Sequence, residues 1–239
     1  HAVTIAAAPI TLASKALTKT YDTTTSTANA TGAGIDIVSG TLFSGDTLSG
    51  GVTVLTDPNV GAPNVTLSGV SVNDGNAGGN YVVGYAAAAA TISPAVINLS
   101  GSRTYDRTTN VEASVFGSTI AGVGGQSLGL GGIGVAAGAE ASRTAYTLSA
   151  GTLALADGTG LARNYTLVGG THAVTITQRP LTAAMQVEDK AYDGTPTAVA
   201  TLVLGNVVPG DAVAAAQVRA GFADAHAGSN KPVAFEAAT

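Results

Sequence analysis

The sequence predicts an all-β protein built from tandem, small β-sandwich-like domains arranged end to end. Three observations lead to this fold class. A Tyr-Asp motif occurs three times, short runs alternate β-branched and polar residues, and turn residues recur at intervals of roughly eight to twelve residues. The alternative fold is a β-grasp-like α+β unit, because residues 211–219 are compatible with a short helical turn.

Two short markers set the period of the repeat. The first is Tyr-Asp with a threonine two residues beyond the aspartate, and its tyrosines stand 84 and then 87 positions apart; the second is Asn-Tyr, which returns after 84. This period exceeds the 20 to 50 residues of a solenoid turn and is that of a small domain. The markers are Tyr21-Asp22, Tyr105-Asp106 and Tyr192-Asp193, with Asn80-Tyr81 and Asn164-Tyr165.

The markers divide the chain into four parts. The first five letters recur unchanged at His172–Ile176, so the chain is expected to open on the last strand of a preceding repeat. The third repeat is expected to lack its final strands, and an unpaired edge invites another chain, so it should be partly unfolded or completed by a neighbour. The parts are 1–9 (last strand of a preceding repeat), 10–94 (complete first repeat), 95–180 (complete second repeat) and 181–239 (incomplete third repeat).

Strands and turns follow in order along each repeat. Alternating segments bounded by glycine, asparagine or aspartate predict strands at 51–55, 65–72 and 165–168. Residues 86–90 are alanines that favour a helix, but their place directly before a closing strand predicts extended backbone. Pro94 and Pro180 are followed almost at once by the next strand, so the short linkers predict a semi-rigid rod.

Composition excludes several classes of function. Charged residues are 10% of the chain, the net charge is −5 and basic residues do not cluster, so no nucleic-acid partner is expected. Cysteine is absent, which excludes disulfides and thiolate metal sites. No apolar run approaches the ~20 residues that span a bilayer, so no membrane insertion is expected. No cofactor is expected.

The motifs resemble those of the YDG-type repeat, a relative of the MBG repeats. The shared features are Lys-x-Tyr-Asp-Gly-Thr at Lys190–Thr195, a later Gly-Asp turn, an Asn-Tyr-x-Leu strand and a closing Ile-x-x-Pro. The second repeat departs most, with Arg107 in place of the motif glycine and a glycine-rich stretch in place of the Gly-Asp turn. Such repeats occur in large bacterial exoproteins of the filamentous-haemagglutinin kind. The resemblance implies a secreted, cell-surface or matrix adhesin of a Gram-negative bacterium, exported through a two-partner pore, and no reaction.

The marker residues are expected to serve folding more than ligand contact. A tyrosine two residues after Lys or Arg lies on the same strand face, where its ring can pack on the basic stem. Aspartate followed by threonine suits an Asx-type turn. A Lys-Asn isopeptide crosslink would need lysine in every repeat, and Arg103 excludes it.

Other motifs that resemble binding sites are expected to be ordinary loops and turns. Residues 129–134 match G-x-G-x-x-G but lack a βαβ context, so a loose glycine-rich loop is expected there. Residues 73–76 favour a hairpin turn over a calcium loop. The three histidines form no cluster, and no enzyme activity, catalytic residue or metal site is expected.

Three functions remain open at this point. The first is a structural spacer that projects an adhesive tip or builds a fibre. The second is a module whose Thr/Ser/Asn surface binds polysaccharide, although the absence of tryptophan argues against a sugar-stacking platform. The third is self-assembly, in which the third repeat accepts strands from another chain by β-augmentation. Expected partners are therefore the adjacent repeats, with self-association or polysaccharide as further candidates.

Overall fold

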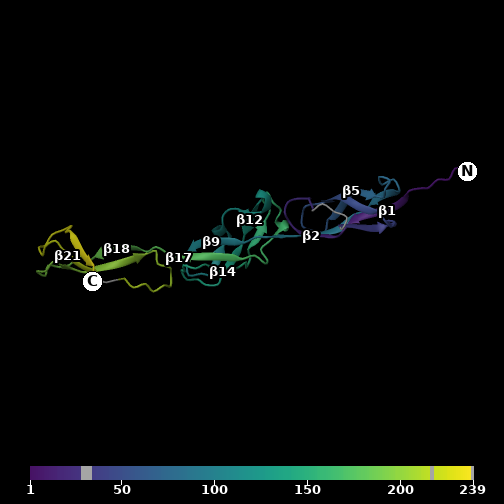
Figure 1. The fold of residues 1–239 in the computed structure, drawn as a ribbon. Coiled ribbons are helices and arrows are strands. Elements are labelled where there is room, and N and C mark those ends of the chain that lie inside the picture. The colour runs from purple at the N-terminus through teal and green to yellow at the C-terminus, as the bar shows by residue number, and fades with distance from the viewer. Residues whose placement is uncertain (28–33, 216–217, 238–239) are drawn as a thin grey trace. The chain divides into compact units, whose positions relative to one another are not determined.

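The computed structural model describes residues 1–27, 34–215 and 218–237. Strands joined by turns and loops make up the ribbon, and the described part contains no α-helix, only short 3-10 turns (Figure 1). The all-β prediction is therefore confirmed. By contacts the chain divides into one unit of His1–Gly101, Asn110–Val135 and Thr147–Ala173 and a second of Ser102–Thr109, Ala136–Tyr146 and Val174–Thr239.

The first repeat is a two-sheet sandwich. In one sheet β1 pairs antiparallel with β3 and parallel with β6; in the other β2 and β7 are parallel, while β5 is antiparallel to both β7 and β4. Both sheets contribute to one core, which includes Leu12 and Leu67. The strands are β1 (Ala8–Ser14), β2 (Leu17–Thr20), β3 (Ile35–Ser39), β4 (Thr47–Leu55), β5 (Asn64–Asn73), β6 (Tyr81–Tyr85) and β7 (Ala88–Ser93).

The second repeat contains a five-stranded sheet in the order β10-β13-β14-β17-β9, a three-stranded sheet β11-β12-β15 and a parallel pair β8-β16. Val111, Leu128 and Val174 are fully buried in it. The strands are β8 (Ala95–Val96), β9 (Leu99–Thr104), β10 (Asn110–Glu112), β11 (Ile120–Ala121), β12 (Ser127–Gly131), β13 (Ile133–Ala136), β14 (Tyr146–Ser149), β15 (Ala154–Ala156), β16 (Tyr165–Thr166) and β17 (His172–Thr177), and the 3-10 turns are η2 (Ala113–Phe116), η3 (Val123–Gly125) and η4 (Ala162–Asn164).

The third repeat has small sheets and little core. One sheet is the antiparallel pair β18-β20, and the other has the order β19-β21-β22. Among the described side chains beyond position 180, Ala198 is the only buried hydrophobic one. The strands are β18 (Thr182–Val187), β19 (Thr197–Ala198), β20 (Ala200–Gly205), β21 (Val218–Phe222) and β22 (Val233–Ala237).

The α+β alternative is wrong for the residues that prompted it. Residues 211–215 belong to no helix or strand and 218–219 lie in β21, while 216–217 fall outside the described residues. The extended backbone expected for the alanine run holds for Ala88–Ala90, which lie in β7 and pair with β2 or β5. Pairing with neighbouring strands thus overrides the helical preference of alanine.

Three local predictions need correction. Residues 129–134 are two strands, β12 and β13, joined at Gly132 (φ 92°), rather than a loose loop. The predicted strand at 165–168 ends at Thr166, because Gly169 adopts a positive φ and a turn forms there. The 73–76 segment is no hairpin, because it connects β5 and β6, which belong to different sheets.

The segment His-Ala-Val-Thr-Ile occurs twice in the sequence and has a different structure at each place. At His172–Ile176 they form part of β17, between β14 and β9. At positions 1–5 they form no strand, and Val3 and Ile5 are almost fully exposed. Strand formation by this segment therefore depends on neighbouring strands more than on its own sequence.

Candidate functional site

The Tyr-Asp markers build the same polar cradle in all three repeats. In each, the aspartate Oδ1 accepts a hydrogen bond of 2.9 Å from the backbone N–H of the threonine two residues on. This is the geometry of an Asx turn. The basic residue three positions before each aspartate forms an ion pair with the same oxygen, at 2.7, 2.5 and 2.8 Å. The three cradles are Lys19-Asp22-Thr24, Arg103-Asp106-Thr108 and Lys190-Asp193-Thr195.

The residue between aspartate and threonine has a left-handed backbone in every copy. The φ angles are 72° at Thr23, 69° at Arg107 and 79° at Gly194. Only glycine adopts this conformation without steric cost, which gives the motif glycine its physical reason. The turn persists in the first two repeats although neither has the glycine.

The cradle keeps its aspartate ionised. The hydrogen bond from Lys190, followed by those from Thr195, lowers the pKa of Asp193 to about 2. At Asp22 and Asp106 burial alone would raise the pKa, but hydrogen bonds from the basic residue and the threonine outweigh it, so both pKa values are lowered. All three carboxylates therefore carry full charge at neutral pH.

A four-residue turn with a positive-φ glycine at its third position also recurs. In each copy the N–H of the fourth residue donates to the carbonyl of the first, at 3.1, 3.1 and 3.0 Å. The second repeat keeps the turn but ends it with Gln126 instead of aspartate. Sequence reasoning missed Gln126; the available signal was the polar residue directly after Gly125. The turns are Phe43–Asp46, Val123–Gln126 and Val208–Asp211.

The Asn-Tyr tyrosine binds the turn of its own repeat. The Tyr81 hydroxyl donates to Asp46 Oδ2 at 2.5 Å and accepts from the Phe43 N–H at 2.9 Å. The Tyr165 hydroxyl makes the equivalent bonds, to Gln126 Oε1 at 2.6 Å and from the Val123 N–H at 3.1 Å. Burial raises the pKa of both tyrosines, and at Tyr81 Asp46 adds to the effect, so both hydroxyls remain protonated donors.

The Tyr-Asp tyrosine reaches the turn of the next repeat. The Tyr21 hydroxyl donates to Gln126 Oε1 at 3.1 Å, and its ring meets that of Tyr165 edge to face, with centroids 5.4 Å apart. The Tyr105 hydroxyl donates in the same way to Asp211 Oδ1, also at 3.1 Å. Gln126, the last residue of its turn, therefore accepts hydrogen bonds from tyrosine hydroxyls of two different repeats.

The asparagine of the Asn-Tyr marker adds further hydrogen bonds between the second repeat and the first. Asn164 is fully buried; its Oδ1 accepts from the Val60 N–H at 2.9 Å, and its Nδ2 donates to Asn59 Oδ1 at 2.7 Å. We call the set Tyr21, Asn59, Gln126, Asn164 and Tyr165 the repeat junction. All five residues belong to the same compact unit. The structure thus brings together marker residues of the first and second repeats.

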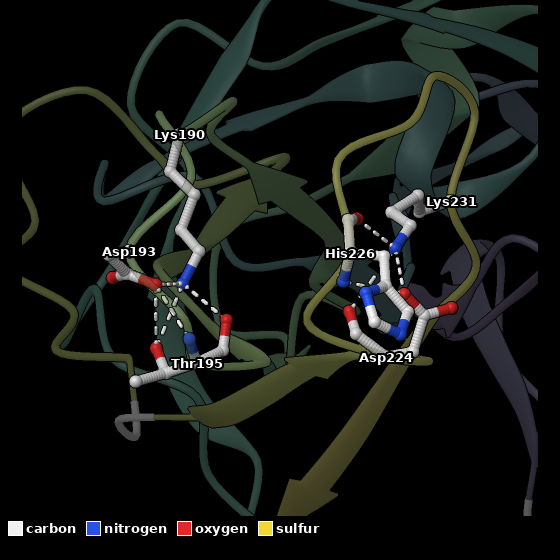
Figure 2. A network of polar contacts seen from close by, with 6 residues as sticks. All are labelled: Lys190, Asp193, Thr195, Asp224, His226 and Lys231. Carbon is white, nitrogen blue, oxygen red and sulfur yellow. Dashed lines mark hydrogen bonds and ion pairs between the residues drawn. The ribbon is translucent and has the colours of Figure 1, made fainter.

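In the third repeat the tyrosine of the Tyr-Asp marker is exposed. Tyr192 is 69% exposed, whereas Tyr21 is 4% exposed. A cavity of about 640 Å³ lies beside Tyr192, between the Lys190 cradle and the loop from Asp224 to Lys231. In that loop Asp224 Oδ1 accepts from the His226 N–H at 2.8 Å, and Lys231 contacts Asp224 and the His226 carbonyl (Figure 2).

The loop of the third repeat matches the loop that Asn164 contacts in the first repeat. Asp57 follows β4 as Asp224 follows β21, and Asp57 Oδ1 accepts from the Asn59 N–H at 2.8 Å. Hydrogen bonds from Asn59 lower the pKa of Asp57, and the one from Lys231 lowers that of Asp224. The third repeat therefore presents both halves of a junction surface, the tyrosine and the loop.

Two other kinds of feature are absent from the described residues. No group of three or more His, Asp or Glu side chains gathers in that part of the chain in a way that could hold a metal ion. Nor does any helix there have the length and apolarity needed to cross a membrane.

The comparisons identify the family. The sequence matches the YDG domain over residues 6–91 and 177–239, more than half of the chain, so this protein belongs to the YDG domain family. Searches of curated proteins and of solved structures gave no match. The matched residues include the Tyr-Asp markers of the first and third repeats.

Proposed function

We propose that this chain is the non-catalytic repeat region of a secreted bacterial surface or matrix adhesin, in which tandem YDG domains act as a semi-rigid stalk or fibre. Membership of the family supports the repeat character. The adhesin role, the export through a two-partner pore and the location outside a Gram-negative cell rest on the resemblance of the motifs to those of large exoproteins.

The observation that carries the proposal is the repeat junction. Tyr21 is buried against Tyr165 and Gln126, and Asn164 is buried against the loop at 59–60. Only Pro94 separates β7 from β8, so the backbone connection adds no flexible spacer. A stalk needs neighbouring domains to resist bending, and these contacts restrain the first repeat against the second.

Distance measurement between spin labels tests the stalk. Because the chain lacks cysteine, Ser68→Cys with Ser149→Cys places one label on β5 and one on β14, both at exposed positions. We expect a narrow distance distribution that broadens when Tyr21→Ala and Gln126→Ala remove the junction. The control pair Thr18→Cys with Ser68→Cys lies within the first repeat and should not change. A broad distribution in the parent chain would contradict the stalk.

A second experiment tests the location. Antibodies against this chain should label intact cells of the source organism, and protease added to intact cells should remove the signal. A signal that appears only after lysis would overturn the extracellular assignment while leaving the junction and the stalk measurement untouched.

A further inference from the structure

We propose that the residue between the aspartate and the threonine of the Tyr-Asp motif selects the turn of the next repeat, and that Arg107 selects a turn that ends in a carboxylate. In this chain Arg107 faces a turn that ends in Asp211, whereas Thr23 faces one that ends in the neutral Gln126. The inference goes beyond the stalk, because it says which repeats fit next to each other. It rests on contacts between consecutive repeats and not on the adhesin role.

The selecting position lies directly against the turn of the next repeat. A Cβ added at Gly124 would stand 3.0 Å from the Thr23 side chain. A Cβ added at Gly210 would overlap the Arg107 guanidinium. Both selecting residues have the left-handed backbone that favours glycine, with φ angles of 72° and 69°. Such strain persists where another requirement outweighs its cost, and the requirement indicated here is contact with the neighbouring turn.

Arg107 makes polar contacts with two of the four residues of its turn. Its Nε lies 3.7 Å from Asp211 Oδ1, and its Nη1 donates to the Pro209 carbonyl at 3.5 Å. The same Asp211 oxygen accepts the Tyr105 hydroxyl, so two side chains of the second repeat converge on one carboxylate oxygen. The arginine therefore meets both the charge and the backbone of the turn.

Negative charge gathers around Asp211, and Arg107 opposes it. Burial raises the pKa of Tyr105, Asp211 and Glu140 raise it further, and the positive charge of Arg107 lowers it. Two carboxylates thus act on the Tyr105 hydroxyl, and the residue at the selecting position supplies charge of the opposite sign. A neutral residue at position 107 would remove that compensation.

The contact between the first and second repeats has neutral chemistry at the same place. Gln126 accepts the hydroxyls of Tyr21 and Tyr165 through an uncharged amide, and Thr23 brings no charge to it. A carboxylate at position 126 would face a threonine instead of a cation, and an arginine at position 23 would face no carboxylate of the turn. Specificity is a difference between matched and mismatched pairs, and the two turn ends provide that difference.

A double-mutant cycle in the 239-residue chain tests the pair. The amide of residue 211 donates to the Val208 carbonyl at 3.0 Å, so its protection from hydrogen exchange reports opening of the turn. We expect Arg107→Gln and Asp211→Asn each to lower this protection about threefold, and the double variant to lower it no further. Asp211→Asn keeps an oxygen for the Tyr105 hydroxyl, so the cycle isolates the charge.

Salt and a second arginine provide the controls for this cycle. High salt should lower the protection in the parent and leave the single variants unchanged, because Arg107 is half exposed and its ion pair is screened. Arg219→Gln removes an exposed arginine on β21 and should leave the protection unchanged. Circular dichroism checks the fold of each variant. Additive losses in the double variant, or an equal loss in Arg219→Gln, would overturn the pair.

Transfer of the pair to the first repeat separates selection from a general gain by arginine. Gln126→Asp should lower the protection of the residue-126 amide, which donates to the Val123 carbonyl at 3.1 Å. Adding Thr23→Arg should restore it about threefold, whereas Thr23→Gln, which lacks the charge, should not. Rescue by both substitutions, rescue by neither, or an equal gain from Thr23→Arg opposite the native Gln126 would overturn the selection.

Discussion

Tyr21 and Tyr192 occupy the same place in the same motif, yet one is buried and the other is exposed. Around both, the local structure is alike: a basic residue, an aspartate and a threonine form the same cradle with nearly the same distances. What differs is the neighbour. The turn and the Asn-Tyr marker of the second repeat cover Tyr21, and the described residues provide no such cover for Tyr192.

Two kinds of contact surround each Tyr-Asp motif: contacts within its own repeat and contacts with the next repeat. The cradle depends only on residues within a few positions of each other, so each repeat forms it alone. The burial of the tyrosine depends on the next repeat. This is the arrangement of a linear repeat array, in which stability is approximately a sum of the terms within each repeat and the terms between nearest neighbours.

The largest expected effect comes from removing the two tyrosines in turn. Tyr21→Ala deletes a buried ring, its edge-to-face contact with Tyr165 and its hydrogen bond to Gln126, and should lower the free energy of unfolding by about 3 kcal/mol. Tyr192→Ala should change it by less than about 0.5 kcal/mol. Urea unfolding of dilute protein measures both. Equal losses would mean that the neighbour adds nothing to the Tyr-Asp motif.

The two asparagines of the second marker give the next largest difference. Asn164→Ala leaves the half-buried Val60 N–H without its acceptor, which should cost about 1–3 kcal/mol. Asn80→Ala removes an exposed amide that contacts Asn76, and the loss should stay below about 0.5 kcal/mol. Hydrogen exchange at the Val60 amide reads the first change directly. Its protection should fall in Asn164→Ala and stay unchanged in Asn80→Ala.

The motif glycine allows a reciprocal exchange between the first and third repeats. Gly194→Thr places a β-branched residue at a φ of 79° and should cost about 1 kcal/mol, since no neighbour lies close enough to add a clash. Thr23→Gly relieves the same strain and should gain about 0.5 kcal/mol after the entropy cost of glycine. Thermal unfolding of both variants checks the opposite signs. If both changes destabilise, the side chain of Thr23 supplies contacts that outweigh its backbone strain.

The sequence predicted the structure within each repeat better than the contacts between repeats. Alternation at 65–72 identified β5, and the Asp-x-Thr pattern predicted a turn at the geometry observed. Gln126 was missed because a glutamine replaces the aspartate, and the distance along the chain from the Tyr-Asp marker to the turn varies between repeats. The partners of Asn164 lie 104 and 105 positions away, and no local pattern encodes such a contact.

The smallest expected effect is a dependence on pH that distinguishes the cradles. The pKa of Asp193 is lowered from its ordinary 3.8 to about 2, because the folded state holds the charged form through Lys190 and Thr195. A carboxyl with a lowered folded-state pKa contributes stability that is fully present above its unfolded pKa and is lost as pH falls through the folded value. The third repeat should therefore lose this contribution between about pH 4 and pH 2.

Asp193→Asn isolates that contribution. The variant should unfold at a slightly lower temperature than the parent at pH 7, and the gap should close as pH falls towards 2. Because the carboxylate is about half exposed, added salt should also narrow the gap at pH 7. In Asp22→Asn the gap should respond less to salt, since the first-repeat lysine is less exposed than Lys190, at 15% against 26%. Equal salt responses at Asp22 and Asp193 would show that covering the motif by the next repeat leaves the electrostatics of its cradle unchanged.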